Sequence, residues 1–273
     1  MPDRPAPGAG DGPGRRADRP RLARRAARHA RERQPLRPRQ RHAGPDPQPD
    51  GALPRGARAL VISVTIDGAT VEVEEGTTVL EAARGAGCAV ASLCFDERLA
   101  PFGACRVCLV GIEGSPGPVP SCTTPCADGM VVSTDDPDSR RVARNVVELV
   151  LSELPSAPGP HTELAAVARE LEAGEPRWTG ETHPVDHDLD HPYLAMQHEL
   201  CISCGRCVRA CDEVQGAFAL TATGRGFDAN IAAGMGTGFR DSSCVSCGAC
   251  ADTCPTDAIT ELSLIAIAQE ATG

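Results

Sequence analysis

The sequence predicts an α+β fold in which two cysteine-rich modules follow a long N-terminal extension. Three observations support this prediction. A run of four cysteines at residues 201–211 occurs again at residues 244–254, another cysteine set follows strand-like alternation at residues 61–73, and the first 58 residues contain almost no large apolar side chain. Domain boundaries are expected to divide the chain into residues 1–58, 59–136, 137–190 and 191–273.

Residues 1–58 are expected to form a disordered, Arg/Pro-rich extension. They contain 15 arginines and 6 acidic residues, whereas the rest of the chain contains 12 arginines and 31 acidic residues. Neither a nucleic-acid tail nor a twin-arginine export signal is favoured, because no aromatic residue is interleaved and no apolar segment follows Arg15-Arg16 or Arg24-Arg25. We favour an extension of little function, or a true translation start near Val61. The acidic remainder repels nucleic acid and suits a basic partner surface.

Residues 59–136 have the element order of a small sheet domain. Apolar and polar side chains alternate on both sides of Asp67-Gly68, a pair typical of a two-residue hairpin turn. Thr77 or Thr78 is placed to cap a short helix. Two further strands are expected at residues 107–113 and 130–135. Strand, strand, helix, cysteine loop, strand, strand is the order of a β-grasp [2Fe-2S] ferredoxin domain.

Four cysteines of this module have the spacing C-x10-C-x2-C-x13-C. They are Cys94, Cys105, Cys108 and Cys122. The pattern is a long-loop relative of the plant-type spacing that holds a [2Fe-2S] cluster. Gly103 is small enough for backbone amides to approach the bridging sulfides. The sequence therefore predicts one [2Fe-2S] cluster here.

Two cysteines, Cys88 and Cys126, remain outside any spacing. The default interpretation of such a residue in a reducing compartment is a small buried side chain. Cys126 lies only four residues beyond Cys122, so spacing alone leaves it open as an alternative fourth ligand. A disulfide framework is disfavoured because no secretory signal is present.

The two later runs each read C-x2-C-x2-C-x3-C, the bacterial two-cluster ferredoxin spacing. In that pattern three cysteines of a run hold one [4Fe-4S] cube and the fourth ligates the other cube. The predicted ligand sets are Cys201, Cys204, Cys207 and Cys254 for one cube, and Cys211, Cys244, Cys247 and Cys250 for the other. Pro255 follows the last cysteine, whereas Asp212 stands at the equivalent place in the first run. Zinc sites are the alternative, disfavoured because zinc has no use for the third and fourth cysteines at these spacings.

The segment between the modules is expected to be a helix followed by a linker. Val142, Val146, Leu149 and Val150 share one helical face, and Pro155 ends the helix. The linker contains one short helix. Its four histidines, interpreted as loop residues rather than metal ligands, are His183, His187, His191 and His198.

Long strings of the sequence carry a family resemblance. GACRVCLVGIEG, SCTTPCADGMVVSTDDP, HPYLAMQHELCISCGRCVRACDEVQGAFAL and SSCVSCGACADTCPTDAITE resemble the N-terminal electron-transfer region of the alpha subunit of bacterial NAD-linked molybdenum formate dehydrogenases. More distantly, they are similar to the large iron-sulfur subunit of complex I and the small diaphorase subunit of NAD-reducing hydrogenases. In the family the cysteine of SCTTP is the fourth [2Fe-2S] ligand, so the resemblance favours Cys122 over Cys126.

The resemblance implies an electron-transfer subunit with one [2Fe-2S] and two [4Fe-4S] clusters. Its expected partners are a molybdopterin catalytic subunit, flavin-containing NAD-reducing subunits, or both, and a hydrogenase or diaphorase complex is the alternative. The sequence differs from this family pattern in two places. The His-x3-Cys-x2-Cys-x5-Cys cluster common in relatives is replaced by HTELAAVARELEAG, and the sequence ends at IAIAQEATG where a molybdopterin domain is expected. We therefore expect no catalytic residues here, no membrane insertion because no run of roughly 20 apolar residues exists, and a cytoplasmic location.

Overall fold

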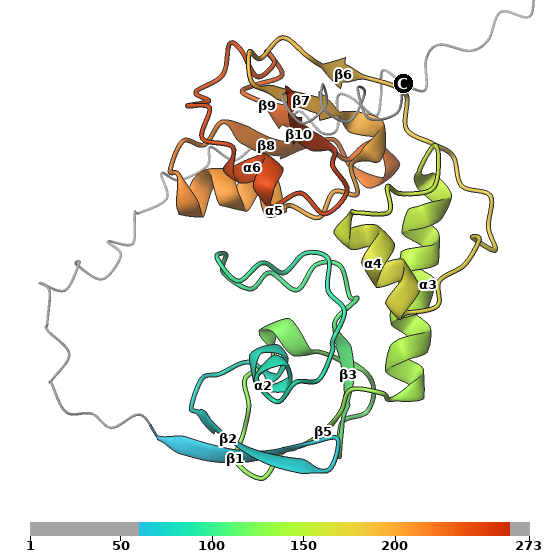
Figure 1. Cartoon of the computed structure of the whole chain (residues 1–273), viewed down its shortest axis with the longest axis vertical. Coiled ribbons are helices and arrows are strands. Elements are labelled where there is room, and N and C mark those ends of the chain that lie inside the picture. Colours follow the sequence, from blue (N-terminus) through green and yellow to red (C-terminus); the bar gives the residue numbers. More distant parts are fainter. Residues whose placement is uncertain (1–59, 263–273) are drawn as a thin grey trace, which may run out of the picture. The chain divides into compact units, whose positions relative to one another are not determined.

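The computed structural model describes residues 60–262, so the expected N-terminal extension lies outside the described residues (Figure 1). Strands β1 (Val61–Ile66) and β2 (Ala69–Glu74) pair antiparallel. Asp67 and Gly68 join them with φ values of 48° and 84°, the left-handed backbone that matches the twist of a tight hairpin. This confirms the predicted hairpin.

The hairpin belongs to a five-stranded mixed sheet with the strand order β2-β1-β5-β3-β4. The remaining strands are β3 (Leu109–Ile112), β4 (Val119–Pro120) and β5 (Val131–Ser133). Strand β5 runs parallel to β1 and antiparallel to β3. This order confirms the expected sequence of elements, with the two-residue strand β4 as an unpredicted addition.

Helix α2 (Val79–Gly85) packs on this sheet and completes its core. Thr78, one of the two predicted caps, accepts a hydrogen bond from the Glu81 amide, while the Glu81 carboxylate accepts one from the Thr78 amide. Such a reciprocal capping box fixes the start of a short helix. The core beneath it consists of aliphatic side chains, including the fully buried Val64 and Ile66.

Helices α3 (Pro137–Glu153) and α4 (Glu163–Glu170) follow the sheet domain. Ala143 and Val147 of α3 are buried in a common core with apolar residues of α4 and of the cysteine loop. The expected apolar face was partly wrong, because Leu149 is 49% exposed. Among residues 60–262, no helix is long and apolar enough to cross a membrane.

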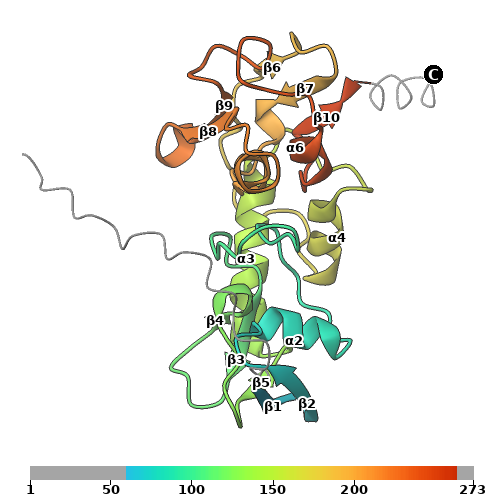
Figure 2. The same ribbon diagram turned by 90° about the vertical axis from the view of Figure 1, so that its left-hand side faces the viewer.

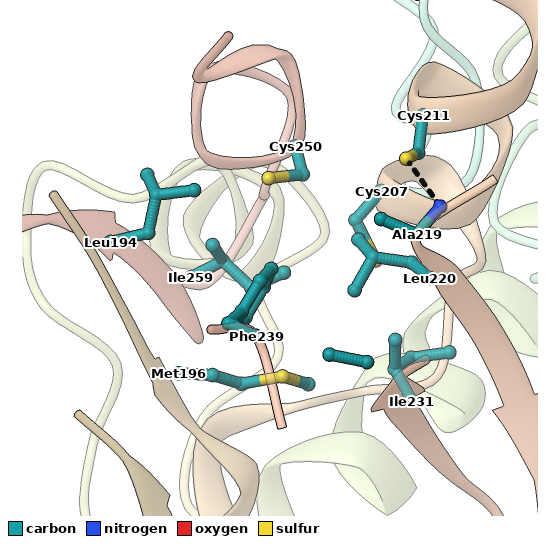
Figure 3. Close-up of a cluster of buried hydrophobic side chains, with 11 residues drawn as sticks. Leu194, Met196, Cys207, Cys211, Ala219, Leu220, Ile231, Phe239, Cys250 and Ile259 are labelled. Carbon is teal, nitrogen blue, oxygen red and sulfur yellow. Dashed lines mark hydrogen bonds between the residues drawn. The ribbon is translucent and has the colours of Figure 1, made fainter. Parts of the chain in front are cut away.

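The C-terminal module contains two small sheets and two short α-helices. One sheet is formed by β6 (His187–Asp188), β7 (Leu194–Gln197) and β10 (Ile259–Glu261), and the other by β8 (Leu220–Thr223) and β9 (Asn230–Ala233). The helices are α5 (Arg206–Arg209) and α6 (Ala249–Asp252), and Figure 2 shows α6 together with strands β6–β10. Figure 3 shows Cys207, Cys211 and Cys250 among the apolar side chains of this module, with Phe239 near their centre.

The internal repeat of the sequence is also a repeat of the backbone. Ser203 and Ser246 have φ values of 51° and 59°, and Gly205 and Gly248 have values of 75° and 77°. Each glycine immediately precedes a helix. The copies differ after their fourth cysteine, since Pro255 cannot continue a helix whereas Asp212 lies within a π-helical continuation of α5.

Candidate iron-sulfur sites

The structure brings together the four cysteines with the long-loop spacing. Cys94, Cys108 and Cys122 are at most 1% exposed, and Cys105 is half-buried. The Cys105 amide lies 3.5 Å from the Cys94 sulfur. A hydrogen bond from the Cys105 thiol lowers the pKa of Cys94 to about 5, and one from Cys122 lowers the pKa of Cys108 to about 6. The same hydrogen bonds raise the pKa of the two donor thiols, Cys105 and Cys122, so each pair readily forms one thiolate. Thiolates are the ligands of iron.

Gly103 allows the cysteine loop to approach the last cysteine of this set. Its φ is +65°, and a Cβ at this position would lie 2.9 Å from Cγ2 of Thr123, the residue after Cys122. Any larger residue would push the loop away from that segment. The expected approach of backbone amides to bridging sulfides at Gly103 stays a prediction.

Cys126 and Cys88 lie apart from this group. The Cys126 side chain packs in the aliphatic core between the sheet and α2, where burial raises its pKa. Cys88 packs against the same core, and its pKa is raised by burial and then by its hydrogen bond to Asp67. Cys122 instead lies in a separate buried cluster with Cys108, Leu80 and Phe95. This geometry favours Cys122 over Cys126 as the fourth cysteine.

The two later runs produce two cavities, and each cavity takes its fourth cysteine from the other run. Four cysteines line what we call the first cavity: Cys201, Cys204, Cys207 and Cys254. Four others line the second cavity: Cys211, Cys244, Cys247 and Cys250. Apolar side chains, among them Met196 in the first and Phe239 in the second, fill most of the remaining walls. The structure therefore groups these eight cysteines into the two sets that the spacing predicts.

Backbone amides point at sulfur atoms in both cavities. The Ser203 amide lies 3.4 Å from the Cys201 sulfur, and the equivalent Ser246 amide lies 3.4 Å from the Cys244 sulfur. The Ala219 amide lies 3.2 Å from the Cys211 sulfur. Such N–H···S contacts stabilise negative charge on thiolates and on clusters that thiolates hold.

Burial disfavours ionisation of Cys204 in the first cavity and of Cys250 in the second. It raises the pKa of Cys204 and of Cys250 to about 12, and neighbouring cysteines of the same cavity add to the shift. Metal binding at such a site must release protons. Among residues 60–262, no three His, Cys, Asp or Glu side chains are arranged to hold a single metal ion. Four thiols around one apolar space with amides aimed at sulfur form a donor set that fits a polynuclear iron-sulfur cluster.

His191 supports the second cavity, a role that the sequence analysis missed. Its Nδ1 accepts hydrogen bonds from the amides of Tyr193 and Leu194 at 3.1 and 3.0 Å, so the ring proton resides on Nε2. Nε2 lies 3.2 Å from the hydroxyl of Ser246, between two cysteines of the second run. No local pattern marks this contact, because the two residues are 55 positions apart.

The other linker histidines make separate contacts. His187 bonds Glu199, His198 bonds Asn230, and the ring of His183 stacks on Phe227. His161, the only histidine of HTELAAVARELEAG, lies 2.6 Å from Asp257. None of these contacts includes a cysteine.

Comparisons with known proteins agree with the two modules. Residues 60–137 match the 2Fe-2S iron-sulfur cluster binding domain family, and residues 200–258 match the 4Fe-4S dicluster domain family. The chain therefore carries an iron-sulfur domain of each kind in an α+β fold. The number of clusters and their ligands stay predictions.

Similar proteins come from respiratory and hydrogenase complexes. An NADH-quinone oxidoreductase subunit of Rhizobium meliloti is 38% identical over 73% of this chain, and the NADP-reducing hydrogenase subunit HndD of Solidesulfovibrio fructosivorans is 34% identical over 74%. These matches cover only 24% and 36% of the two relatives. A solved NAD+-reducing [NiFe]-hydrogenase chain superimposes with a TM-score of 0.67 at 28% identity, covering 74% of this chain and 88% of that one. The expected similarity to complex I and hydrogenases is confirmed, whereas the closer resemblance to formate dehydrogenase stays a prediction.

Proposed function

We propose that this chain, with its 2Fe-2S domain and its 4Fe-4S dicluster domain, is the electron-transfer component of a larger NAD(P)-linked oxidoreductase complex. The pair of four-cysteine cavities with exchanged fourth cysteines is the observation that supports this most. A site that only stabilised a fold would need neither two such cavities nor a third group of four cysteines paired by hydrogen bonds.

The proposed ligand sets follow the three groups of cysteines. The [2Fe-2S] ligands are Cys94, Cys105, Cys108 and Cys122, the first-cavity [4Fe-4S] ligands are Cys201, Cys204, Cys207 and Cys254, and the second-cavity [4Fe-4S] ligands are Cys211, Cys244, Cys247 and Cys250. Bound clusters supply one-electron carriers, and the potential of each responds to burial and to hydrogen bonds at sulfur. The chain's own part is to hold these carriers in apolar surroundings, aim amides at the thiolates and exclude water.

Two kinds of complex fit this role. The motif strings favour a formate dehydrogenase, with a molybdopterin subunit as electron donor and flavin-containing NAD-reducing subunits as acceptor. The named relatives favour a hydrogenase or NADH-linked complex. An electron-delivery experiment separates the two assignments. The iron-sulfur protein is mixed either with a molybdopterin subunit and formate or with a hydrogenase subunit and H2. Reduction of the clusters is followed by the bleaching of their visible absorption, and the mixture that bleaches identifies the kind of complex. Formate oxidation by the purified chain alone would contradict both assignments.

Iron and acid-labile sulfide analysis tests the proposal itself. Anaerobically purified protein should contain about ten iron and ten sulfide per chain, the sum for one [2Fe-2S] and two [4Fe-4S] clusters. Zinc without sulfide would establish the alternative of a zinc-stabilised interaction protein. We also propose a cytoplasmic location, because fourteen reduced cysteines require a reducing compartment.

A further inference from the structure

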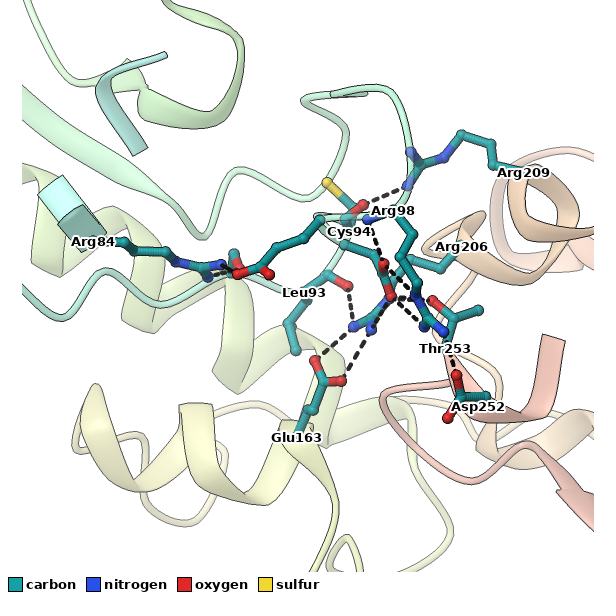
Figure 4. A network of polar contacts seen from close by, with 12 residues as sticks. Arg84, Leu93, Cys94, Arg98, Glu163, Arg206, Arg209, Asp252 and Thr253 are labelled. Carbon is teal, nitrogen blue, oxygen red and sulfur yellow. Dashed lines mark hydrogen bonds and ion pairs between the residues drawn. The ribbon is translucent and has the colours of Figure 1, made fainter. Parts of the chain in front are cut away.

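The loop between the first two predicted [2Fe-2S] ligands, Cys94 and Cys105, makes its main polar contacts outside the 2Fe-2S domain. We call residues 93–102 the docking loop. It accounts for nearly all of the ten-residue spacing between Cys94 and Cys105, and it contacts the two short helices of the dicluster domain (Figure 4). The unusual length of this spacing therefore has a counterpart in the structure.

Arg206 of α5 is the centre of these contacts and is only 3% exposed. Its two terminal nitrogens bond the carboxylate of Glu163 on α4 at 2.6 and 3.0 Å. One of them also lies 3.2 Å from Asp96 in the docking loop. Its Nε donates to the Thr253 hydroxyl at 3.0 Å, and that hydroxyl donates to Asp96 at 2.7 Å. One buried guanidinium thus joins four separate segments of the chain.

Arg209, one helical turn further along α5, bonds the docking loop at two carbonyl oxygens. It reaches the Cys94 carbonyl at 2.5 Å and the Ala100 carbonyl at 2.6 Å. Its guanidinium also lies over the Phe102 ring, 5.2 Å from the centroid, a geometry that favours a cation–π interaction. The backbone of a predicted [2Fe-2S] ligand is therefore bonded to the helix that carries Cys207.

The second helix meets the same loop with the opposite charge. Asp252 of α6 occupies the position equivalent to Arg209 and pairs with Arg98. Arg98 in turn pairs with Asp96 at 2.9 Å. In the docking loop, the acidic Asp96 faces Arg206 of α5, and the basic Arg98 faces the aspartate of α6. This arrangement of charges favours one orientation of the loop on the two helices.

The internal repeat shows that the loop conformation of a cysteine run does not itself require Arg206. The equivalent residue of the second run is Ala249, and that run has the same left-handed serine and glycine conformations and the same amide-to-sulfur contact. Burying a guanidinium is costly unless every donor is paired, and a buried ion pair often adds no net stability over apolar side chains of similar volume. Alanine at this position is therefore enough for the conformation of a cysteine run. The contacts that Arg206 adds are with residues of other segments.

We propose that Arg206, with Glu163, Asp96 and Thr253, is a positioning device that fixes the [2Fe-2S] site against the first cavity. Arg206 precedes the first-cavity cysteine Cys207, and Thr253 precedes Cys254. This inference rests on the proposed function and specifies which sites would be neighbours: a [2Fe-2S] cluster held by the first group of cysteines would exchange single electrons with a [4Fe-4S] cluster held in the first cavity, with no atom transferred. The donor to the [2Fe-2S] cluster, or the acceptor in the reverse direction, is a redox subunit of the complex.

The test measures the magnetic interaction between these two clusters in the full chain reduced with dithionite. A nearby paramagnetic [4Fe-4S] cluster accelerates the relaxation of the [2Fe-2S] EPR signal, so the half-saturation power reports their separation. Arg206→Ala, which installs the residue of the second run, should lower the half-saturation power severalfold while iron stays at about ten per chain. The control is Arg141→Ala, which removes an exposed ion pair with Asp138 and should change nothing.

Each outcome decides the inference. An iron-complete Arg206→Ala protein with unchanged relaxation overturns it. If Arg206→Ala loses iron, Glu163→Ala decides, because Glu163 lies on α4 outside both cysteine runs. That variant should keep its iron and lower the half-saturation power, whereas unchanged relaxation or iron loss there refutes positioning. Failure of the proposed function is distinguishable, since unaltered protein would then contain no iron-sulfur clusters.

Discussion

At the scale of single residues, the two cysteines Cys122 and Cys126 differ by their surroundings. Cys122→Ala is expected to abolish or strongly weaken the [2Fe-2S] EPR signal, because its thiol faces Cys108. Cys126→Ala is expected to keep that signal and to cost about 1 kcal/mol of stability, as removal of a small buried group does. Cys88→Ala, whose side chain packs on the same core as Cys126, is a second control. Loss of the signal in Cys126→Ala with retention in Cys122→Ala would reverse the ligand assignment.

His191 is expected to matter for the second cavity alone. His191→Phe keeps a ring beside Phe239, whose centroid lies 5.8 Å from that of His191, but leaves two backbone amides without an acceptor. Each such loss costs about 1–3 kcal/mol. The Ser246 loop loses its hydrogen-bond partner at the same time. Of the two [4Fe-4S] EPR signals, one should therefore broaden or disappear, and iron should be released at lower temperature.

The matched control for His191 is His183→Phe. His183 stacks on Phe227, and the pockets that it lines contain Cys201 of the first run but no residue of the second run. An equal effect of the two substitutions on the EPR spectrum would show that His191 acts only through general stability. An effect of His191→Phe on both cubes would show that its influence is not confined to the Ser246 loop.

Contacts of individual residues were predictable only where sequence spacing determines them. The first three cysteines of each later run follow from short, regular spacings, because a tight loop brings its own ligands together. The long-spaced group from Cys94 to Cys122 and the exchange of fourth cysteines were predicted from known ferredoxin patterns. The contact between His191 and Ser246 spans 55 positions, and that between Arg206 and Asp96 spans 110. No periodicity relates such positions, so these contacts depend on how separately formed elements pack.

At the scale of secondary-structure elements, local chemistry determined most boundaries. The Asp67-Gly68 turn and the Thr78 cap are local signals, and the structure confirms both. Strand β4 was not predicted, because a strand of two residues is too short to show an alternation of apolar and polar side chains. Leu149 was misplaced because helical periodicity defines a stripe but not its limits; the neighbours of α3 bury Ala143 and Val147 instead.

The exchange of fourth cysteines between the two runs is a property of helices α5 and α6. Cys211 lies beyond the end of α5 and lines the cavity of the other run, while Cys254 lies beyond α6 and lines the first cavity. Cys211→Ala should therefore convert the second-cavity cube to a three-iron form with an altered EPR signal. Cys254→Ala should do the same to the first-cavity cube.

To tell which of the two cubes has changed, Cys211→Ala must also be examined in a variant whose first-cavity cube is already altered. Cys211→Ala would be compared in the unaltered protein and in a protein that carries Cys204→Ser, which perturbs the first cavity. Independent changes of two cubes in the double variant agree with the exchange. If the double variant instead shows one damaged and one intact cube, each run binds its own cluster and the exchanged ligand sets are wrong.

At the scale of the whole molecule, the two iron-sulfur modules have cores of different kinds. The sheet domain contains an aliphatic core built on Val64, Ile66 and Val79 that is independent of its four proposed ligands. The core of the dicluster domain contains Cys207, Cys211 and Cys250 among its buried members, and its strands have four residues or fewer. Small modules with so little apolar surface need metal to fold.

Removal of the clusters should therefore unfold the two modules to different extents. After anaerobic treatment with a chelator and an oxidant, amides of β7–β10 should exchange hydrogen at rates near those of an unfolded chain, because their core depends on cysteines that the clusters hold together. Amides of β1 and β2 should retain substantial protection, since an aliphatic core lies beneath them. The measurement is hydrogen–deuterium exchange by mass spectrometry, with the cluster-loaded protein as control. Equal loss of protection in both modules would show that the sheet domain also depends on its cluster, and undiminished protection in the C-terminal module would show that its apolar residues suffice without metal.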